Sequence, residues 1–128
     1  MDRPTRHEQA IAILKLRGHR LASEILGRRA TNAADFSAAF NVEHIDLIAA
    51  IPDEEGLLAL GRNIVGPRDG LYILRDDGTY RVYTQEKGEA RAEIRGDFDA
   101  AREAAVDALI QLGGLPYVPA GSKRSGSR

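Results

Sequence analysis

Apolar residues in the first 65 positions recur at the spacing of helices, in short stretches such as Ile11, Ile13 and Leu14. A further helix of one or two turns is expected to begin at Asp53 and to end before Gly61. Residues that start or stop helices separate these stretches, namely Thr5 with Glu8 as a capping box, Gly18, Gly27, Asn32 and Pro52. Residues 1–65 are therefore predicted to be mainly helical.

The pattern changes to that of strands after Gly66. Residues 71–75 and 79–85 are rich in β-branched and aromatic side chains, and they flank Asp76-Asp77-Gly78, a sequence typical of a tight hairpin turn. Glu86-Lys87-Gly88 turns the chain again. Residues 66–96 are therefore predicted to form a three-stranded antiparallel meander.

The third strand, residues 89–95, alternates strictly between polar and apolar side chains. This alternation predicts one solvent-exposed face and one buried face. The exposed face would carry Glu89, Arg91 and Glu93, and the buried face would carry Ala90, Ala92 and Ile94. An Ile94→Asp substitution is then expected to cost about 3 kcal/mol or more, because it places a charge in the core.

Residues 97–113 have the pattern of a helix that ends at Gly113-Gly114. Asp97 can cap it, and its apolar residues fall in one stripe: Phe98, Ala101, Ala105, Ala108, Leu109 and Leu112. A three-stranded sheet cannot bury its apolar face alone, so we expect this helix and the N-terminal helices to cover it. The expected fold class is α+β: N-terminal helices, a three-stranded antiparallel β-meander and a C-terminal helix packed on the sheet.

Length and composition indicate one ordinary globular domain. The chain has 128 residues, of which 43% are hydrophobic and 29% charged. We expect a single domain over residues 1–120 and a disordered basic tail over residues 121–128, which are rich in Gly and Ser. The absence of cysteine excludes disulfides and thiolate sites. Neither a signal-peptide pattern nor a long apolar run is present, so we expect a cytoplasmic protein without a membrane segment.

The net charge of −1 conceals a segregation along the chain. Residues 1–30 carry seven Arg or Lys and three Asp or Glu, whereas residues 31–120 carry eight and sixteen. Charge asymmetry of this kind affects partners and association rates. A solvated surface with uneven charge is the alternative interpretation.

No pattern in the sequence indicates catalysis, a metal or a cofactor. His7, His19 and His44 have no metal-ligand spacing, and surface or cap roles are expected for them. The glycines of Gly61 to Gly66 lack the Lys and Ser or Thr of a phosphate loop. Asp76-Asp77-Gly78 lacks the alternating acids of a calcium loop. We therefore expect no catalytic residues, no metal and no cofactor.

Residues 69–112 resemble the C-terminal part of small immunity proteins from bacterial polymorphic and contact-dependent growth inhibition toxin systems. The resemblance lies in Asp69-Gly70-Leu71-Tyr72, the Asp77-Gly78 turn, Tyr80-Arg81-Val82-Tyr83, the Glu86-Lys87-Gly88 turn and the Ala-rich helix that begins at Phe98. It implies a non-catalytic cytosolic antidote, an inhibitor that acts by protein–protein interaction. Its partner would be the C-terminal toxin domain of a cognate toxin, commonly a nuclease.

An acidic surface would suit such a partner, because a nuclease that holds phosphates presents a basic cleft. One of Tyr80 and Tyr83 is also expected to be exposed, since they lie on opposite faces of a strand. The expected partner-binding residues are Asp53, Glu54, Glu55, Asp69, Asp76, Asp77, Tyr83, Glu86 and Glu89.

A nucleic-acid-binding regulator that uses the basic residues 1–30 is the alternative function. Its helix-turn-helix match is poor, because Leu14 and Glu24 stand where a small and an apolar residue are usual. The acidic remainder of the chain would also repel phosphate, so nucleic acid is not the expected partner.

Overall fold

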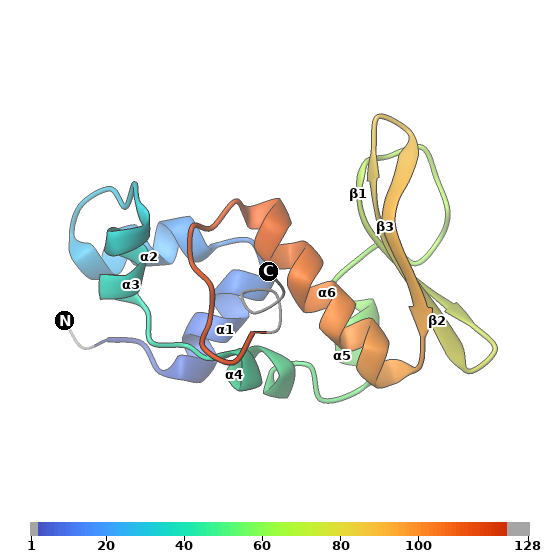
Figure 1. Cartoon of the computed structure of the whole chain (residues 1–128), viewed down its shortest axis with the longest axis horizontal. Coiled ribbons are helices and arrows are strands. Elements are labelled where there is room, and N and C mark those ends of the chain that lie inside the picture. The colour runs from blue at the N-terminus through green and yellow to red at the C-terminus, as the bar shows by residue number, and fades with distance from the viewer. Residues whose placement is uncertain (1–2, 123–128) are drawn as a thin grey trace. The chain divides into compact units, whose positions relative to one another are not determined.

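The computed structural model describes residues 3–122, which form six helices and one sheet (Figure 1). The elements in chain order are α1 (Arg6–Leu14), α2 (Gly18–Leu26), α3 (Ala33–Ala39), α4 (His44–Ala49), α5 (Glu54–Leu58), β1 (Gly70–Asp76), β2 (Thr79–Glu86), β3 (Glu89–Gly96) and α6 (Phe98–Gly113). Helices followed by a three-stranded antiparallel sheet and a C-terminal helix confirm the predicted α+β class.

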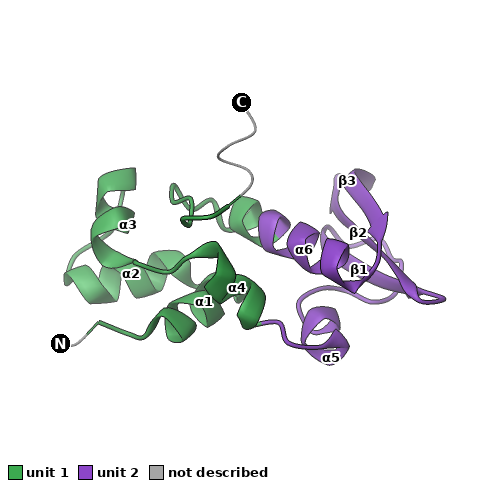
Figure 2. Cartoon of the chain, turned by 60° about the horizontal axis from the view of Figure 1, so that its bottom comes forward, with its two compact units in different colours: residues 1–50, 109–128 green, residues 51–108 purple. Residues whose placement is uncertain are grey.

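The chain divides into two compact units (Figure 2). Unit 1 comprises residues 1–50 and 109–128, and unit 2 comprises residues 51–108, so α6 contributes to both. The expectation of a single domain over residues 1–120 stays a prediction. Within residues 3–122, none of the helices combines the length and apolar character that a membrane span requires.

Three helix ends of unit 1 lie where the sequence placed them, whereas Gly18, expected to stop the first helix, begins α2, and α1 ends at Leu14. The Thr5 hydroxyl accepts a hydrogen bond from the Glu8 amide at 3.0 Å, and the Glu8 carboxylate accepts one from the Thr5 amide at 2.8 Å, so the capping box is confirmed. Gly27 ends α2 in the left-handed conformation, with φ of 72°. The Asn32 side chain accepts from the Asp35 amide at the start of α3.

The buried Gln9 side chain joins α1 to the segment before α4. Its carbonyl oxygen accepts from the amides of Asn41 at 3.0 Å and Val42 at 3.1 Å. Its amide donates to the Pro4 carbonyl at 2.9 Å and to the Asn41 side chain at 2.8 Å. A buried amide with all of these bonds satisfied stabilises one backbone arrangement, because any other would leave polar groups unpaired.

The segment after α6 packs within unit 1. The Tyr117 hydroxyl donates to the Val42 carbonyl at 2.9 Å, and its ring meets Phe40 edge to face. The Ala120 carbonyl accepts from the His44 amide at 2.9 Å. Ser122, expected in the tail, is buried. Residues 123–128 of the expected tail lie outside the described residues.

Asp35 ties α3 to the chain that precedes it. Its carboxylate accepts from the Arg28 guanidinium at 2.8 Å and from the Thr31 amide at 2.9 Å. The bond from Arg28, followed by that from the Thr31 amide, holds the pKa of this carboxyl well below its usual range.

In unit 2, β2 is the central strand and pairs with β1 and β3 in antiparallel register. Both hairpins close through two residues with positive φ: 48° and 83° for Asp77 and Gly78, and 53° and 83° for Lys87 and Gly88. These are the angles of type I′ turns, whose twist matches that of the strands. The predicted hairpin positions are confirmed.

The predicted buried face of β3 is wrong. Ala90, Ala92 and Ile94 are all exposed, and Ile94 keeps 45% of its surface accessible. The whole of this edge strand from Glu89 to Arg95 is exposed, on both faces. A bulge also breaks the alternation: Val82 pairs with Ile94 and Thr84 with Arg91, so two residues of β3 stand opposite Tyr83. This shift places Ala90 and Ile94 on opposite faces of an edge strand. The large cost expected for Ile94→Asp therefore does not follow.

Helix α6 contacts the strands through its first turn. Asp97 caps it by accepting from the Ala100 amide at 2.9 Å, as predicted. The Phe98 ring lies 6.4 Å from the Tyr80 ring, edge to face. The predicted apolar stripe is partly wrong, because Leu112 is 45% exposed while Val106 and Ile110 are buried. The buried positions of α6 are Ala101, Ala105, Val106, Leu109 and Ile110.

The Asp35 contacts predict a loss of stability in acid. A carboxyl whose pKa is lower in the folded than in the unfolded state stabilises the fold above the unfolded value, and this contribution is lost as pH falls through the folded value. Thermal unfolding should therefore show declining stability below about pH 4. Asp35→Asn should be less stable at neutral pH and decline less in acid. Glu24→Gln, which removes an exposed carboxylate, should keep the full decline.

The bulge predicts a stabilising substitution in β3. Ala92 has a φ of 54°, a conformation that costs a residue with a Cβ about 1 kcal/mol and costs glycine little. Glycine relieves this strain but loses more conformational entropy on folding than alanine does, so Ala92→Gly should raise the free energy of unfolding by at most about 1 kcal/mol, measured in urea. Ala90→Gly in the same exposed strand, where φ is negative, should lower it. Equal effects of the two glycines would contradict the assignment of strain to Ala92.

Candidate functional site

Five of the expected partner-binding acids lie at one end of the sheet, beside the Asp77-Gly78 turn. The link between them is Glu54, whose carboxylate accepts from the Tyr80 hydroxyl and lies 3.4 Å from the Arg75 guanidinium. Arg75 and Tyr80 are cross-strand partners next to that turn. We call this surface the acidic end; its acids are Asp53, Glu54, Glu55, Asp76 and Asp77.

Several acids of the acidic end already have structural roles. Asp53 caps α5 by accepting from the Gly56 amide at 2.9 Å. The hydrogen bond from Tyr80 to Glu54, together with burial, raises the pKa of the Tyr80 hydroxyl. Asp76 lies 3.9 Å from Arg95. Glu55 and Asp77 are exposed, and within residues 3–122 no cap or ion pair depends on their side chains.

The other three acids lie at the opposite end of the sheet, beside the Lys87-Gly88 turn. Asp69 accepts from the amides of Lys87 at 2.9 Å and Gly88 at 3.3 Å, so it fastens this turn to the chain before β1. Glu86 and Glu89 both pair with Arg91, at 3.7 and 3.6 Å. Strands of seven and eight residues separate the two ends by about 20 Å, so the expected acids do not form one cluster.

Tyr83 is not exposed, and the expectation that one of Tyr80 and Tyr83 remains in solvent is wrong. Tyr83 keeps only 4% of its surface accessible and stacks on Tyr72, with ring centroids 5.1 Å apart and planes 5° from parallel. Tyr80 is buried on the other face against Phe98. Both tyrosines are buried because both faces of the first hairpin are covered, a feature that alternation along one strand does not reveal.

The histidines do not form a site. His7 and His19 are both exposed, and the His19 ring packs edge to face against the Phe36 ring. His44 is buried at the start of α4, so the expected surface location is wrong for it. Within residues 3–122, no group of three or more His, Asp or Glu side chains has an arrangement that could hold a metal ion.

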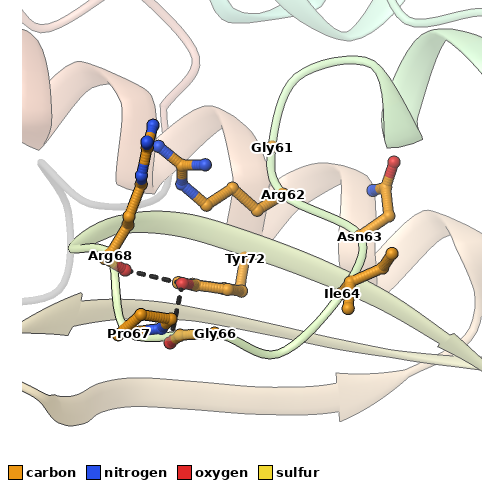
Figure 3. A pocket seen from close by; sticks show the side chains of 8 residues that line it. All are labelled: Gly61, Arg62, Asn63, Ile64, Gly66, Pro67, Arg68 and Tyr72. Carbon is orange, nitrogen blue, oxygen red and sulfur yellow. Dashed lines mark hydrogen bonds between the residues drawn. The ribbon is translucent and has the colours of Figure 1, made fainter.

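A pocket of about 590 Å³ lies in the connection between α5 and β1, and none of the residues that line it was a candidate from the sequence (Figure 3). Its lining is mixed, with two arginines, an exposed isoleucine and the buried Tyr72. The residues that line it are Gly61, Arg62, Asn63, Ile64, Gly66, Pro67, Arg68 and Tyr72.

Hydrogen bonds to the sheet hold both ends of this loop. The Arg62 amide donates to the Leu71 carbonyl, and the Arg62 carbonyl accepts from the Ile73 amide, both at 2.9 Å. At the other end the Tyr72 hydroxyl donates to the carbonyls of Gly66 at 3.0 Å and Arg68 at 2.6 Å, as the dashed lines in Figure 3 show. The pocket is therefore built from ordered backbone.

One signal in the sequence could have indicated this loop. Ile64 and Val65 are adjacent apolar residues between Gly61 and Gly66-Pro67, in a connection that has no regular structure. Ile64 is 82% exposed and Val65 65%, higher than any other large apolar residue in the described part of the chain. Neighbouring exposed apolar residues are a feature of interaction surfaces.

Comparisons with known proteins found no match: no family model, no curated protein and no solved structure is similar to this chain.

The Tyr72 bonds predict a specific loss of order in the loop. Tyr72→Phe removes both hydroxyl bonds and should lower the free energy of unfolding by about 1–2 kcal/mol. It should also speed amide exchange over residues 61–69. Tyr83→Phe is the matched control, because its ring is stacked in the same pair and its hydroxyl makes no hydrogen bond within residues 3–122. If both variants behave alike, the hydroxyl bonds do not hold the loop.

Proposed function

We propose that this chain is a non-catalytic, cytoplasmic binding protein that neutralises a cognate bacterial toxin by occluding its active site. The partner is the C-terminal toxin domain, of nuclease type. The proposal combines the resemblance over residues 69–112 with a property of the folded chain, the separation of charge between its two units.

The observation that carries the proposal is the opposite charge of the two units. Unit 1 has ten Arg or Lys and six Asp or Glu, so its net charge is +4. Unit 2 has eight and thirteen, so its net charge is −5. An acidic unit attracts a basic, phosphate-binding cleft at long range, and this attraction raises the association rate.

Within unit 2, the acidic end is the better candidate for this contact. Its five acids are offset by two arginines, Arg75 and Arg95, and Glu55 and Asp77 remain exposed. At the opposite end three acids face Lys87 and Arg91, and Asp69 is already bonded to two amides. Within the described part of the chain, the acidic end therefore offers two acids whose side chains are not already engaged, whereas each of the three acids at the opposite end is.

The alternative is a nucleic-acid-binding regulator that uses the basic unit 1. Several of its arginines are engaged internally, Arg6 with Asp46 at 2.8 Å and Arg28 with Asp35 at 2.8 Å. DNA binding by the isolated chain that weakens steeply with salt would favour this function. Reproducible turnover of a nucleic acid, ester or phosphoester, abolished by one substitution, would favour an enzyme.

The first test uses the polypeptide encoded directly upstream of this chain. Its C-terminal domain, about 150 residues, is expressed in a bacterial host with and without this chain. We expect growth to stop without the chain and to continue with it, and the two proteins to copurify as a complex. An upstream domain that does not arrest growth, or an arrest that this chain does not relieve, would refute the proposal.

The second test measures association rates for two matched variants. Glu55→Gln with Asp77→Asn removes two charges from the acidic end, and Asn tolerates the positive φ of the turn. Glu86→Gln with Glu89→Gln removes two charges from the opposite end. We expect the first variant to associate several-fold more slowly at low salt, with the difference vanishing near 1 M, where the screening length is about 3 Å. Equal rates for both variants would remove the acidic end as the contact.

A further inference from the structure

Two arginines of unit 2 differ from all the others in their contacts. The other five arginines of this unit each form an ion pair with an acid of the same unit: Arg75, Arg81, Arg91, Arg95 and Arg102. Arg62 and Arg68 form none within residues 3–122, although unit 2 has thirteen acids. These two are also the two arginines that line the α5–β1 pocket.

The backbone of each of these arginines is fixed. Arg62 bridges to β1 through its amide and carbonyl, and Asn63 reinforces the bridge by donating to the Ile73 carbonyl at 2.9 Å. The Arg68 carbonyl accepts from Tyr72 and, at 3.0 Å, from the Gln85 side chain. Figure 3 shows the two side chains extending to the same side of the Tyr72 ring. An anion bound between them would need little rearrangement of the backbone, which reduces the entropic cost of binding.

Exposed apolar side chains belong to the same loop as this pair of cations. Ile64 lines the same pocket and Val65 follows it, and both are mostly exposed. A ligand that suits the whole loop therefore carries a negative charge next to apolar groups.

We propose that the α5–β1 loop binds a carboxylate side chain of a protein partner, held between Arg62 and Arg68, with flanking apolar side chains of the same segment against Ile64 and Val65. Guanidinium groups bind carboxylates through paired, charge-assisted hydrogen bonds. The inference goes beyond the proposed function, because it requires an acidic protein segment but not a toxin.

The surroundings favour a protein carboxylate over a nucleic acid. A polyanion that reached Arg62 and Arg68 would also approach a unit of net charge −5, which repels it. A single carboxylate brings only one negative charge, so it is repelled less. The exposed Ile64 and Val65 would gain no apolar contact from a phosphate backbone. Charge and apolar surface together therefore point to an acidic peptide segment.

The test titrates the purified full-length chain with a capped tripeptide, leucine–aspartate–leucine, and with its asparagine counterpart. The arginine side-chain N–H signals are followed by NMR. We expect saturable shifts of the Arg62 and Arg68 signals, with the aspartate peptide binding about tenfold more tightly than the asparagine one. Arg62→Gln with Arg68→Gln should abolish this preference, and Ile64→Ser with Val65→Ser should weaken both peptides.

Arg91→Gln with Arg95→Gln is the matched control, because it removes two positive charges of unit 2 that are engaged in ion pairs. It should keep the preference, and thermal unfolding should show that both arginine variants are folded. Equal binding of the two peptides, or equal loss in both arginine variants, would overturn the proposal. So would inorganic phosphate binding to the loop as tightly as the aspartate peptide.

Discussion

The buried hydroxyl of Tyr72 imposes the constraint on which the structure of unit 2 depends most. The Tyr72 side chain is fully buried against Tyr83, so its hydroxyl requires hydrogen-bond partners inside the protein. The carbonyls of Gly66 and Arg68 satisfy this need, and the Gln85 side chain donates to the same two carbonyls. The connection from α5 to β1 therefore folds back over the sheet, and this return creates the pocket.

Covering both faces of the β1–β2 hairpin limits where a partner can bind. No tyrosine of this hairpin is left as an exposed anchor, and the remaining open element is the edge strand β3. Charged side chains line β3 and a bulge interrupts it at Ala92, both of which discourage pairing with another strand. The two proposed contacts therefore lie elsewhere, one at the acidic end and the other at the α5–β1 loop.

The arginines of unit 2 fall into two groups, those that form an ion pair within the unit and those that do not. Five of the seven arginines neutralise neighbouring acids, as Arg81 does with Glu93 at 3.1 Å, where the pair lowers the pKa of the Glu93 carboxyl. Exposed pairs of this kind contribute little to stability individually, but they lower the local field. Charges without such a neighbour, on Arg62 and Arg68, therefore keep most of their attraction for an outside ligand.

The sequence by itself determined the features that depend on a few neighbouring residues. The Thr5–Glu8 capping box, the Asn32 cap and both hairpin turns involve groups within about four positions of one another, so their local geometry is encoded locally. Tertiary structure decided the burial of Tyr83, the bulge at Ala92 and the convergence of Arg62 and Arg68 on one pocket. Each of these results from contacts between segments far apart in the chain, where burying an apolar surface or satisfying a buried polar group outweighs the local pattern.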